Sequence, residues 1–209
     1  GNTATTQSGE QNQAATGSAK GNNGSKIVPV SLVALGGYGR GELNPGSDVD
    51  VMFLHPDVGK KVPQALQQTV EQVLYLLWDI GFKVGHSTRS VREAIAQANG
   101  DMLTKTAMLE ARHLTGDSDL FQRFRARFRK HCVEGHEKEY IAARMQDQAQ
   151  RHEKFGNNIY LQEPDVKRGC GGLRDYQNLL WMTCFKEGAL TTTHLVGKDW
   201  LSASDGRRI

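Results

Sequence analysis

The amino-acid sequence predicts an α+β protein, in which a small sheet with flanking helices is followed by an all-helical region. Two observations lead to this prediction. Near the start, two short apolar segments enclose a glycine-rich turn, and a helix-like segment and a third strand-like segment follow them. Beyond residue 90, apolar residues recur at the three- and four-residue steps of helices. We therefore expect a sheet domain at residues 27–100 and a helical domain at 101–209.

The two ends of the chain differ in composition from the middle. Residues 1–26 consist almost wholly of Gly, Asn, Thr, Ala, Gln and Ser. Such a segment buries too little apolar surface to offset its ordering entropy, which predicts a disordered tail. Residues 195–209 end in what reads as the start of another element, so we expect the helical domain to be truncated at its C-terminus.

The predicted sheet domain contains three strands and one long helix. Residues 30–35 form an apolar run that ends at two glycines, and residues 48–54 form a second run, as buried strands do. Pro63 opens a helix that Gly81 ends, with apolar positions Leu66, Val70, Val73, Leu74 and Leu77. Residues 82–88 alternate as a third strand would. The order strand, strand, helix, strand predicts a small α/β unit.

The remaining segments predict helices. Ser90 and Glu93 have the spacing of a capping box, and Asp101 can cap the next helix. We expect helices at residues 90–99, from 101 to about Leu114, at 119–134, onward to Phe155, and at 174–186. The third of these places phenylalanines on one face and basic residues on the rest: Arg123, Arg125, Arg127, Arg129 and Lys130. A solvated face is the favoured interpretation of the basic run, and contact with an acidic partner is the alternative.

Charge and cysteine usage exclude several classes of protein. The chain has 26 basic and 23 acidic residues, a net charge of +3, too weak to indicate nucleic acid but compatible with a phosphate-bearing ligand. No apolar run approaches the ~18 residues that span a bilayer. Three distant cysteines without CxxC spacing exclude a disulfide scaffold and a cysteine zinc site. We expect a cytoplasmic protein without nucleic-acid or membrane partners.

The most informative segment runs from Gly36 to Asp50. Asp48 and Asp50 are two residues apart on a predicted strand, so both side chains point to one face. Two close carboxylates repel each other unless a cation lies between them. Oxygen ligands that leave room for substrate phosphates suit Mg²⁺.

The residues before the two aspartates favour a phosphate ligand. Gly36 and Gly37 let the backbone approach a triphosphate, and Arg40 offers a charged fork for its oxygens. The combination predicts metal-dependent phosphoryl or nucleotidyl transfer. A glycine-rich hairpin with two solvated acids is the alternative, but it leaves unexplained why both acids share a face of an apolar strand.

The segment resembles the nucleotidyltransferase superfamily of DNA polymerase beta, whose pattern is Gly-Gly or Gly-Ser, a spacer, and Asp-x-Asp. More narrowly, the chain resembles the bifunctional protein-PII uridylyltransferase/uridylyl-removing enzymes from about Ser31 to Ser204. Four further segments carry this likeness: Leu77-Trp78-Asp79-Ile80-Gly81, Val84-Gly85-His86-Ser87, Leu109-Glu110-Ala111-Arg112 and residues 161–175, which read LQEPDVKRGCGGLRD.

The resemblance implies a polymerase-beta-like sheet and a Mg²⁺-dependent transfer of UMP from UTP to a tyrosine hydroxyl of the nitrogen-regulatory protein PII, with release of pyrophosphate. It also implies the roles of six residues: Asp48 and Asp50 as metal ligands, Gly36, Gly37 and Arg40 as triphosphate contacts, and Ser47 as a support of the metal loop. No histidine here precedes an aspartate, so the metal-hydrolase chemistry of uridylyl removal is not expected.

Several points stay open at this stage. The superfamily usually takes a third carboxylate from a later strand, and residues 82–88 contain none. His86, Glu163 and Asp165 are candidates for the missing base or ligand, and His86 could equally be a polar residue at a strand end. The loop at 167–172 could bind an anion through its N–H groups or be a tight connection. ATP in place of UTP, or a regulatory module that binds nucleotide without turnover, are the alternative functions.

Overall fold

A mixed four-stranded sheet forms the centre of the protein. The computed structural model describes residues 28–59, 62–155, 163, 165–188 and 191–207, so the expected disorder of residues 1–26 falls outside the described residues. The strands are β1 (Ser31–Ala34), β2 (Val49–His55), β3 (Val84–Ser90) and β4 (Arg112–Gly116), in the order β3-β2-β1-β4. The predicted α+β class is confirmed.

The register of the strands follows from their connections. β1 pairs antiparallel with β2 and with β4, whereas β2 pairs parallel with β3. A parallel pair needs a crossover, and α2 (Gln64–Asp79) supplies it. In this register Asp50 lies opposite Gly85 and Val51 lies opposite His86.

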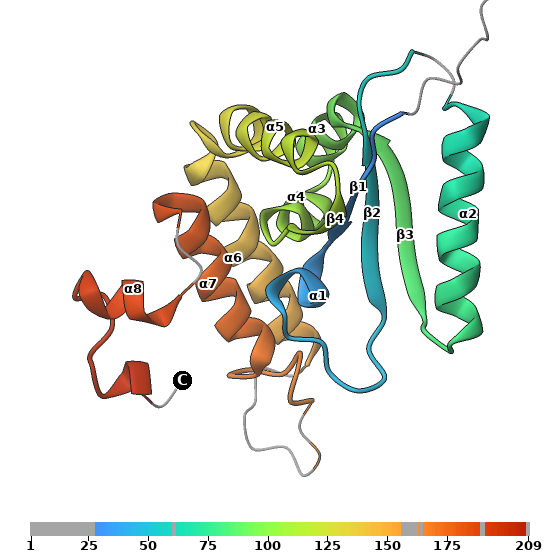
Figure 1. Cartoon of the computed structure of the whole chain (residues 1–209). Helices are drawn as coiled ribbons and strands as arrows, with labels where there is room; N and C mark the ends of the chain where they lie inside the picture. The colour runs from blue at the N-terminus through green and yellow to red at the C-terminus, as the bar shows by residue number, and fades with distance from the viewer. Residues whose placement is uncertain (1–27, 60–61, 156–162, 164, 189–190, 208–209) are drawn as a thin grey trace, which may run out of the picture.

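The two faces of β2 pack against different helices. Val49, Val51 and Phe53 contact α2, whose buried residues are Leu66, Val70 and Leu74. Met52 and Leu54 point the other way, as strand alternation requires, into a core shared with α3 (Val91–Gly100), α4 (Met102–Leu109) and α5 (Ser118–Phe128). Figure 1 shows α2 on one side of the sheet and α3, α4 and α5 on the other.

The chain turns at the helix ends that the sequence predicted. Ser90 and Glu93 form the expected capping box at α3, with the Ser90 N–H donating to Glu93 Oε2 at 2.8 Å. Asp101 caps α4 by accepting from the Thr104 N–H at 2.7 Å. The phenylalanine stripe of α5 is buried, as expected of a helix whose basic residues face outward.

One predicted helix is wrong over part of its length. The segment expected to be helical to Leu114 leaves the helix after Leu109 and forms β4 on the free edge of β1. Gly116, with φ +93°, passes so close to the Val30 carbonyl that a Cβ would collide with it. Ladder hydrogen bonds from β1 thus outweigh the local helical pattern. The sheet takes a strand from beyond residue 100, and the boundary there stays a prediction.

The helical region packs against the α4 side of the sheet. α5 continues into a π-helical turn, η1 (Arg129–Val133), and α6 (Glu137–Lys154) packs on α7 (Leu173–Glu187), where the Tyr140 and Phe185 rings stack at 3.9 Å. α8 (Thr192–Gly197) and a 3₁₀ turn, η2 (Asp205–Arg207), follow. Within the described ranges, no helix combines the length and apolarity that crossing a membrane requires.

Removing the ring of Phe124 tests the core. Phe124 is 0% exposed between the sheet and α3, so Phe124→Ala leaves a cavity and should lower the free energy of unfolding by about 3–5 kcal/mol. Urea denaturation followed by circular dichroism measures this change. Arg123→Ala, on the exposed face of the same helix, is the matched control and should change stability by less than about 0.5 kcal/mol. Equal effects of the two substitutions would contradict the assigned inward face of α5.

Candidate active site

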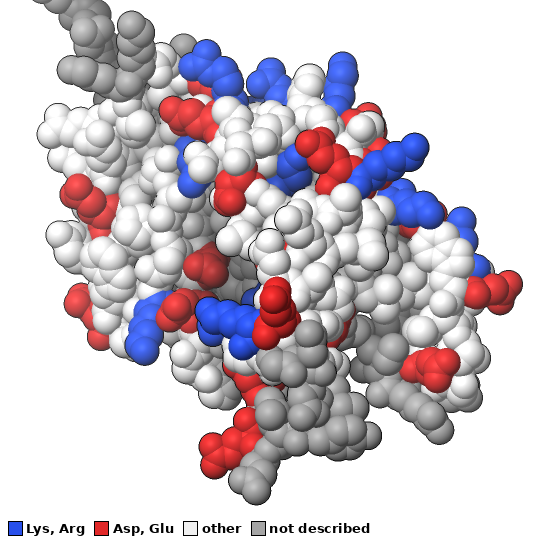
Figure 2. All heavy atoms as spheres, turned by 180° about the vertical axis from the view of Figure 1, so that it is seen from behind, with Lys and Arg blue, Asp and Glu red and all other residues white. Residues whose placement is uncertain are grey.

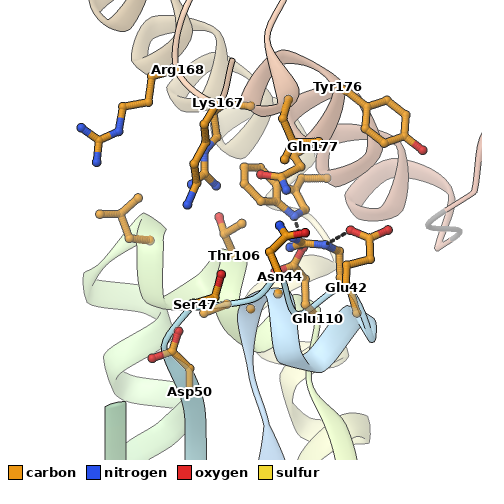
Figure 3. Close-up of a pocket in the computed structure, with 18 of the residues that line it drawn as sticks. Glu42, Asn44, Ser47, Asp50, Thr106, Glu110, Lys167, Arg168, Tyr176 and Gln177 are labelled. Carbon is orange, nitrogen blue, oxygen red and sulfur yellow. Dashed lines mark hydrogen bonds and ion pairs between the residues drawn. The ribbon is translucent and has the colours of Figure 1, made fainter. Parts of the chain in front are cut away.

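A cavity of about 910 Å³ lies where the start of β2 faces α4, α6 and α7. One wall comes from the glycine-rich segment, including Gly36, Gly37 and Ser47, together with both aspartates of the predicted motif. The opposite wall comes from the helical region. In Figure 3, Ser47 and Asp50 lie on one side of an open space, and Lys167 and Arg168 lie across it. Figure 2 shows acidic and basic side chains interspersed around a hollow in the face it draws.

The two aspartates share the cavity as the sequence predicted. Asp50 is the second residue of β2, Asp48 precedes the strand, and both line the cavity. They are on the face of β2 that Met52 and Leu54 continue, toward α4 rather than α2. The pKa of Asp50 is raised above its usual value by partial burial and then by the charge of Asp48. The negative charge of Asp48 therefore acts on the Asp50 carboxylate within the same cavity.

Glycine at position 85 makes room for the Asp50 carboxylate. Gly85 lies directly opposite Asp50 in the parallel pair, and a Cβ at residue 85 would collide with Asp50 Oδ1. Any larger side chain there would push the carboxylate aside. β3 could have supplied a third acidic side chain at this position, but its glycine leaves space beside the Asp50 carboxylate instead.

This donor set suits a divalent cation. Asp48 and Asp50 offer only oxygen, and a cation between them would offset both the burial of Asp50 and the charge of Asp48, which together raise the Asp50 pKa. Within the described ranges, no group of three or more His, Cys, Asp or Glu side chains could hold a metal. The remaining ligands of a cation at the pair would thus be water or substrate oxygens, as Mg²⁺ favours. The metal-binding role stays a prediction.

Arg40 lines the cavity but is held by carboxylates. Its guanidinium contacts Glu42 at 2.9 Å and forms a short ion pair with Glu110, and only 12% of its side chain is exposed. Burial alone would lower the pKa of Arg40, but these two acids raise it above its usual value. The predicted phosphate contact is thus already engaged in ion pairs.

Glu110 and Arg112 hold the motif in place, a role the sequence did not predict for them. The Glu110 carboxylate is buried and also accepts a short hydrogen bond from Trp181 Nε1 on α7. Arg112 donates to the Gly39 carbonyl at 3.0 Å and the Tyr38 carbonyl at 2.7 Å, at the end of α1 (Gly36–Arg40). The segment 109–112 therefore connects the glycine-rich turn to the helical region.

The structure does not bring His86 to the site. His86 lies opposite Val51, whose side chain faces α2, and its ring meets the Trp78 ring on that helix at 6.2 Å. Strand alternation places the histidine on the face opposite Asp50. The structure therefore places His86 outside the cavity, and of the two interpretations it favours a polar residue on the strand.

The other two candidates do not line the cavity either. Glu163 is exposed, and Asp165 uses its carboxylate to accept the N–H groups of Lys167 at 2.9 Å and Arg168 at 2.8 Å. These N–H groups lower the pKa of Asp165, that of Arg168 most. The Asp165 carboxylate thus holds the turn at residues 165–168 and does not line the cavity.

The loop at residues 167–172 is a tight connection between α6 and α7, and it does not form an anion site from its N–H groups. The N–H groups of Gly169, Gly172 and Leu173 donate to carbonyls within residues 165–169, and the Gly171 N–H donates to Asp175. These amides are therefore unavailable to an external anion. Of the two interpretations left open, the structure supports the structural connection.

The sequence did not predict the basic wall of the cavity. Five cations line it from the helical region: Arg144, Arg151, Lys167, Arg168 and Arg174. The seven-residue step from Arg144 to Arg151 places both on one face of α6, which is the one signal that could have indicated them. Their approach to the aspartates depends on how α6 and α7 pack against α4, and a single sequence does not show this.

Comparisons with known proteins agree with this arrangement. Residues 21–107 match the family described as nucleotidyltransferase domain, and residues 139–209 match the family described as GlnD PII-uridylyltransferase. The fold and the paired aspartates therefore define a nucleotidyltransferase domain that is followed by a helical region.

Individual relatives show which nucleotidyltransferases this chain is similar to. Proteins named bifunctional uridylyltransferase/uridylyl-removing enzyme are 42% identical over 178 residues in Novosphingobium aromaticivorans, 46% over 167 in Azospirillum brasilense and 43% over 174 in Rhodospirillum rubrum. The matches cover 85%, 80% and 83% of this chain. The chain is a homologue of these enzymes, and it spans 19%, 18% and 18% of their lengths.

One solved structure is similar at a lower sequence identity. It is the crystal structure of a toxin-antitoxin with AMP-PNP, at 15% identity and a TM-score of 0.30, covering 62% of this chain and 85% of that chain. A likeness this distant supports no argument about function.

Removing the Glu110 carboxylate tests its role as a connection. Glu110→Ala leaves Arg40 and Trp181 without their buried acceptor, so the free energy of unfolding should fall by about 3–5 kcal/mol. Glu42→Ala removes an acid that is 55% exposed and should cost less than about 1 kcal/mol. Urea denaturation of the two variants checks both values. A Glu110→Ala protein as stable as Glu42→Ala would show that the contact is not structural.

A methyl group at residue 85 tests the space beside Asp50. Gly85→Ala should keep the fold but displace the carboxylate and weaken the binding of Mn²⁺, a probe for Mg²⁺, roughly tenfold or more. Titration followed by electron paramagnetic resonance measures the affinity. Gly100→Ala, where an added Cβ meets no atom within 4 Å, is the control. Unchanged Mn²⁺ affinity in Gly85→Ala would contradict Asp50 as a ligand.

Proposed function

We propose that this chain transfers UMP from UTP to a tyrosine hydroxyl of the signalling protein PII and releases pyrophosphate, with Mg²⁺ held by Asp48 and Asp50. The observation that carries the proposal is the pair of aspartates on one strand face in a large cavity next to the Gly36-Gly37 turn. Identity of 42–46% to uridylyltransferases supports the same chemistry. The substrates are carried over from what those relatives are named for.

In the proposed reaction one bond forms and one bond breaks, both at the α-phosphorus of UTP. The tyrosine oxygen attacks the α-phosphorus and forms a new P–O bond, while the bond from that phosphorus to the α,β-bridging oxygen breaks. Pyrophosphate leaves with the electron pair, and the phenolic proton passes to water. Bound Mg²⁺ would supply charge stabilisation to the attacking and leaving oxygens.

The protein's own residues would position the nucleotide. Gly36 and Gly37 line the cavity at the first turn of α1, where the absence of side chains leaves the backbone open to the phosphates. Ser47 lines the same wall, and its N–H donates to the Asn44 carbonyl at 3.0 Å, which closes the turn before the aspartates. We assign Ser47 to holding the metal-binding loop.

One observation favours a second candidate, a module that binds nucleotide without turnover. Gly85 occupies the β3 position opposite Asp50, where a third carboxylate would be nearest. Incubation with Mg²⁺, PII and each α-labelled nucleotide separates the candidates. Label from UTP on PII supports the proposal, label from ATP supports an adenylyl-transferring enzyme, and nucleotide binding without transfer supports the module.

Neutral replacement of either aspartate tests the metal role. Asp48→Asn and Asp50→Asn keep the size of the side chain but remove the charge that holds the cation, so labelling of PII should fall by at least about 100-fold. Filter-bound radioactivity after incubation with labelled UTP measures transfer, and circular dichroism checks folding. Asp79→Asn, at the end of α2 and away from the cavity, is the control. Full activity of Asp50→Asn would exclude the assigned role.

A further inference from the structure

The cavity wall opposite the aspartates is basic and comes from the loop between α6 and α7 and from the start of α7. Lys167 and Arg168 are in this loop, and Arg174 is the second residue of α7. All three side chains line the cavity, and Figure 3 shows Lys167 and Arg168 across the open space from Asp50. The cavity thus has acids on the sheet side and cations on the helical side.

Hydrogen bonds hold the segment 165–172, which carries Lys167 and Arg168, against the ends of α6 and α7. Asp175 accepts hydrogen bonds from Arg151 Nη2 at 2.6 Å, His152 Nε2 at 2.9 Å and the Gly171 N–H at 2.8 Å. Burial would raise the pKa of Asp175, but these donors lower it. Arg151 also donates to the Arg168 carbonyl at 2.9 Å. Residues 167 and 168 are therefore held at fixed backbone positions.

The cations of the cavity fall into two groups. Arg40, Arg144 and Arg151 each pair with a carboxylate, from Glu110, Asp147 and Asp175 respectively. Lys167, Arg168 and Arg174 form no ion pair with any described residue. Arg174 lies over the Trp181 ring at 5.1 Å, and its pKa is lowered by burial and by Arg144, Arg40 and Arg151. This side of the cavity therefore has positive charge without a compensating anion.

We propose that Lys167, Arg168 and Arg174 bind the β- and γ-phosphates of the nucleoside triphosphate and hold the pyrophosphate that leaves, whereas Arg40 positions α1 through Glu110. The inference rests on the proposed function, because it assigns the leaving group of that reaction. A polyphosphate between the two walls would meet a metal at the aspartates on one side and three unpaired cations on the other. Arginine forks and a lysine ammonium are the usual partners of phosphate oxygens.

Binding of inorganic pyrophosphate to the whole chain is the direct test. Isothermal titration in the presence of Mg²⁺ should show about tenfold weaker binding for Lys167→Ala and for Arg168→Ala, since each loses a charge-assisted contact. Lys138→Ala on the exposed surface of α6 makes the same charge change and should bind as the unsubstituted chain does. Equal affinities in the double variant Lys167→Ala/Arg168→Ala and in Lys138→Ala would overturn the proposal.

Arg174 needs a test that separates binding from packing against Trp181. Arg174→Ala should weaken pyrophosphate binding about tenfold or more, and Arg174→Lys should restore part of this loss because it keeps the charge. Thermal unfolding shows whether either variant is destabilised, and if Arg174→Ala does not fold, the two loop variants decide. Failure of Arg174→Lys to bind better than a folded Arg174→Ala would contradict a charge-based role.

Transfer assays distinguish this inference from the proposed function. If the chain labels PII from UTP, Lys167→Ala and Arg168→Ala should raise the KM for UTP about tenfold, and an unchanged KM would overturn the phosphate assignment alone. If the chain transfers no label but pyrophosphate binding depends on the three cations, the proposed transfer fails and the anion site stands.

Discussion

The buried carboxylate of Glu110 is the contact on which the arrangement of the cavity depends. One of its oxygens accepts from Arg40 at the end of α1 and from Trp181 on α7, so a single atom joins the glycine-rich turn to the helical region. Glu110 is only 4% exposed as a residue and its charge requires such partners, because an unpaired buried charge is strongly unfavourable. The turn beside the aspartates and the helix that carries Arg174 are therefore held together.

Both halves of the chain contribute to the lining of the cavity. β2 brings Asp48 and Asp50 to one face, while α6, α7 and the loop between them bring the cations. Arg144, buried beneath them, donates to Asn178 at 2.9 Å and lies over the Trp181 ring at 4.5 Å, which supports the same indole that contacts Glu110. Charges of opposite sign thus face each other across a space wide enough for a nucleotide.

Local sequence patterns predicted most of the elements and the acidic half of the site. The capping box of Ser90 and Glu93, the phenylalanine face of α5 and the shared face of the two aspartates depend on residues a few positions apart, so periodicity was sufficient. The helix expected to run to Leu114 was wrong, because β4 forms there, and the local patterns did not show that His86 faces α2 or that Arg40 is paired with Glu110. Each depends on a partner distant in sequence: the edge of β1, the register with β2, and Glu110.

The sequence by itself thus determined the α+β class, the strand that begins between Asp48 and Asp50, and the glycine-rich turn before it. Alternation along a strand and capping at a helix end are properties of neighbouring residues and hold wherever the segment lies. Only the tertiary structure decided which cations face the aspartates and which are already paired. Packing of α6 and α7 on α4 sets those distances, and ion pairing depends on separation in space rather than along the chain.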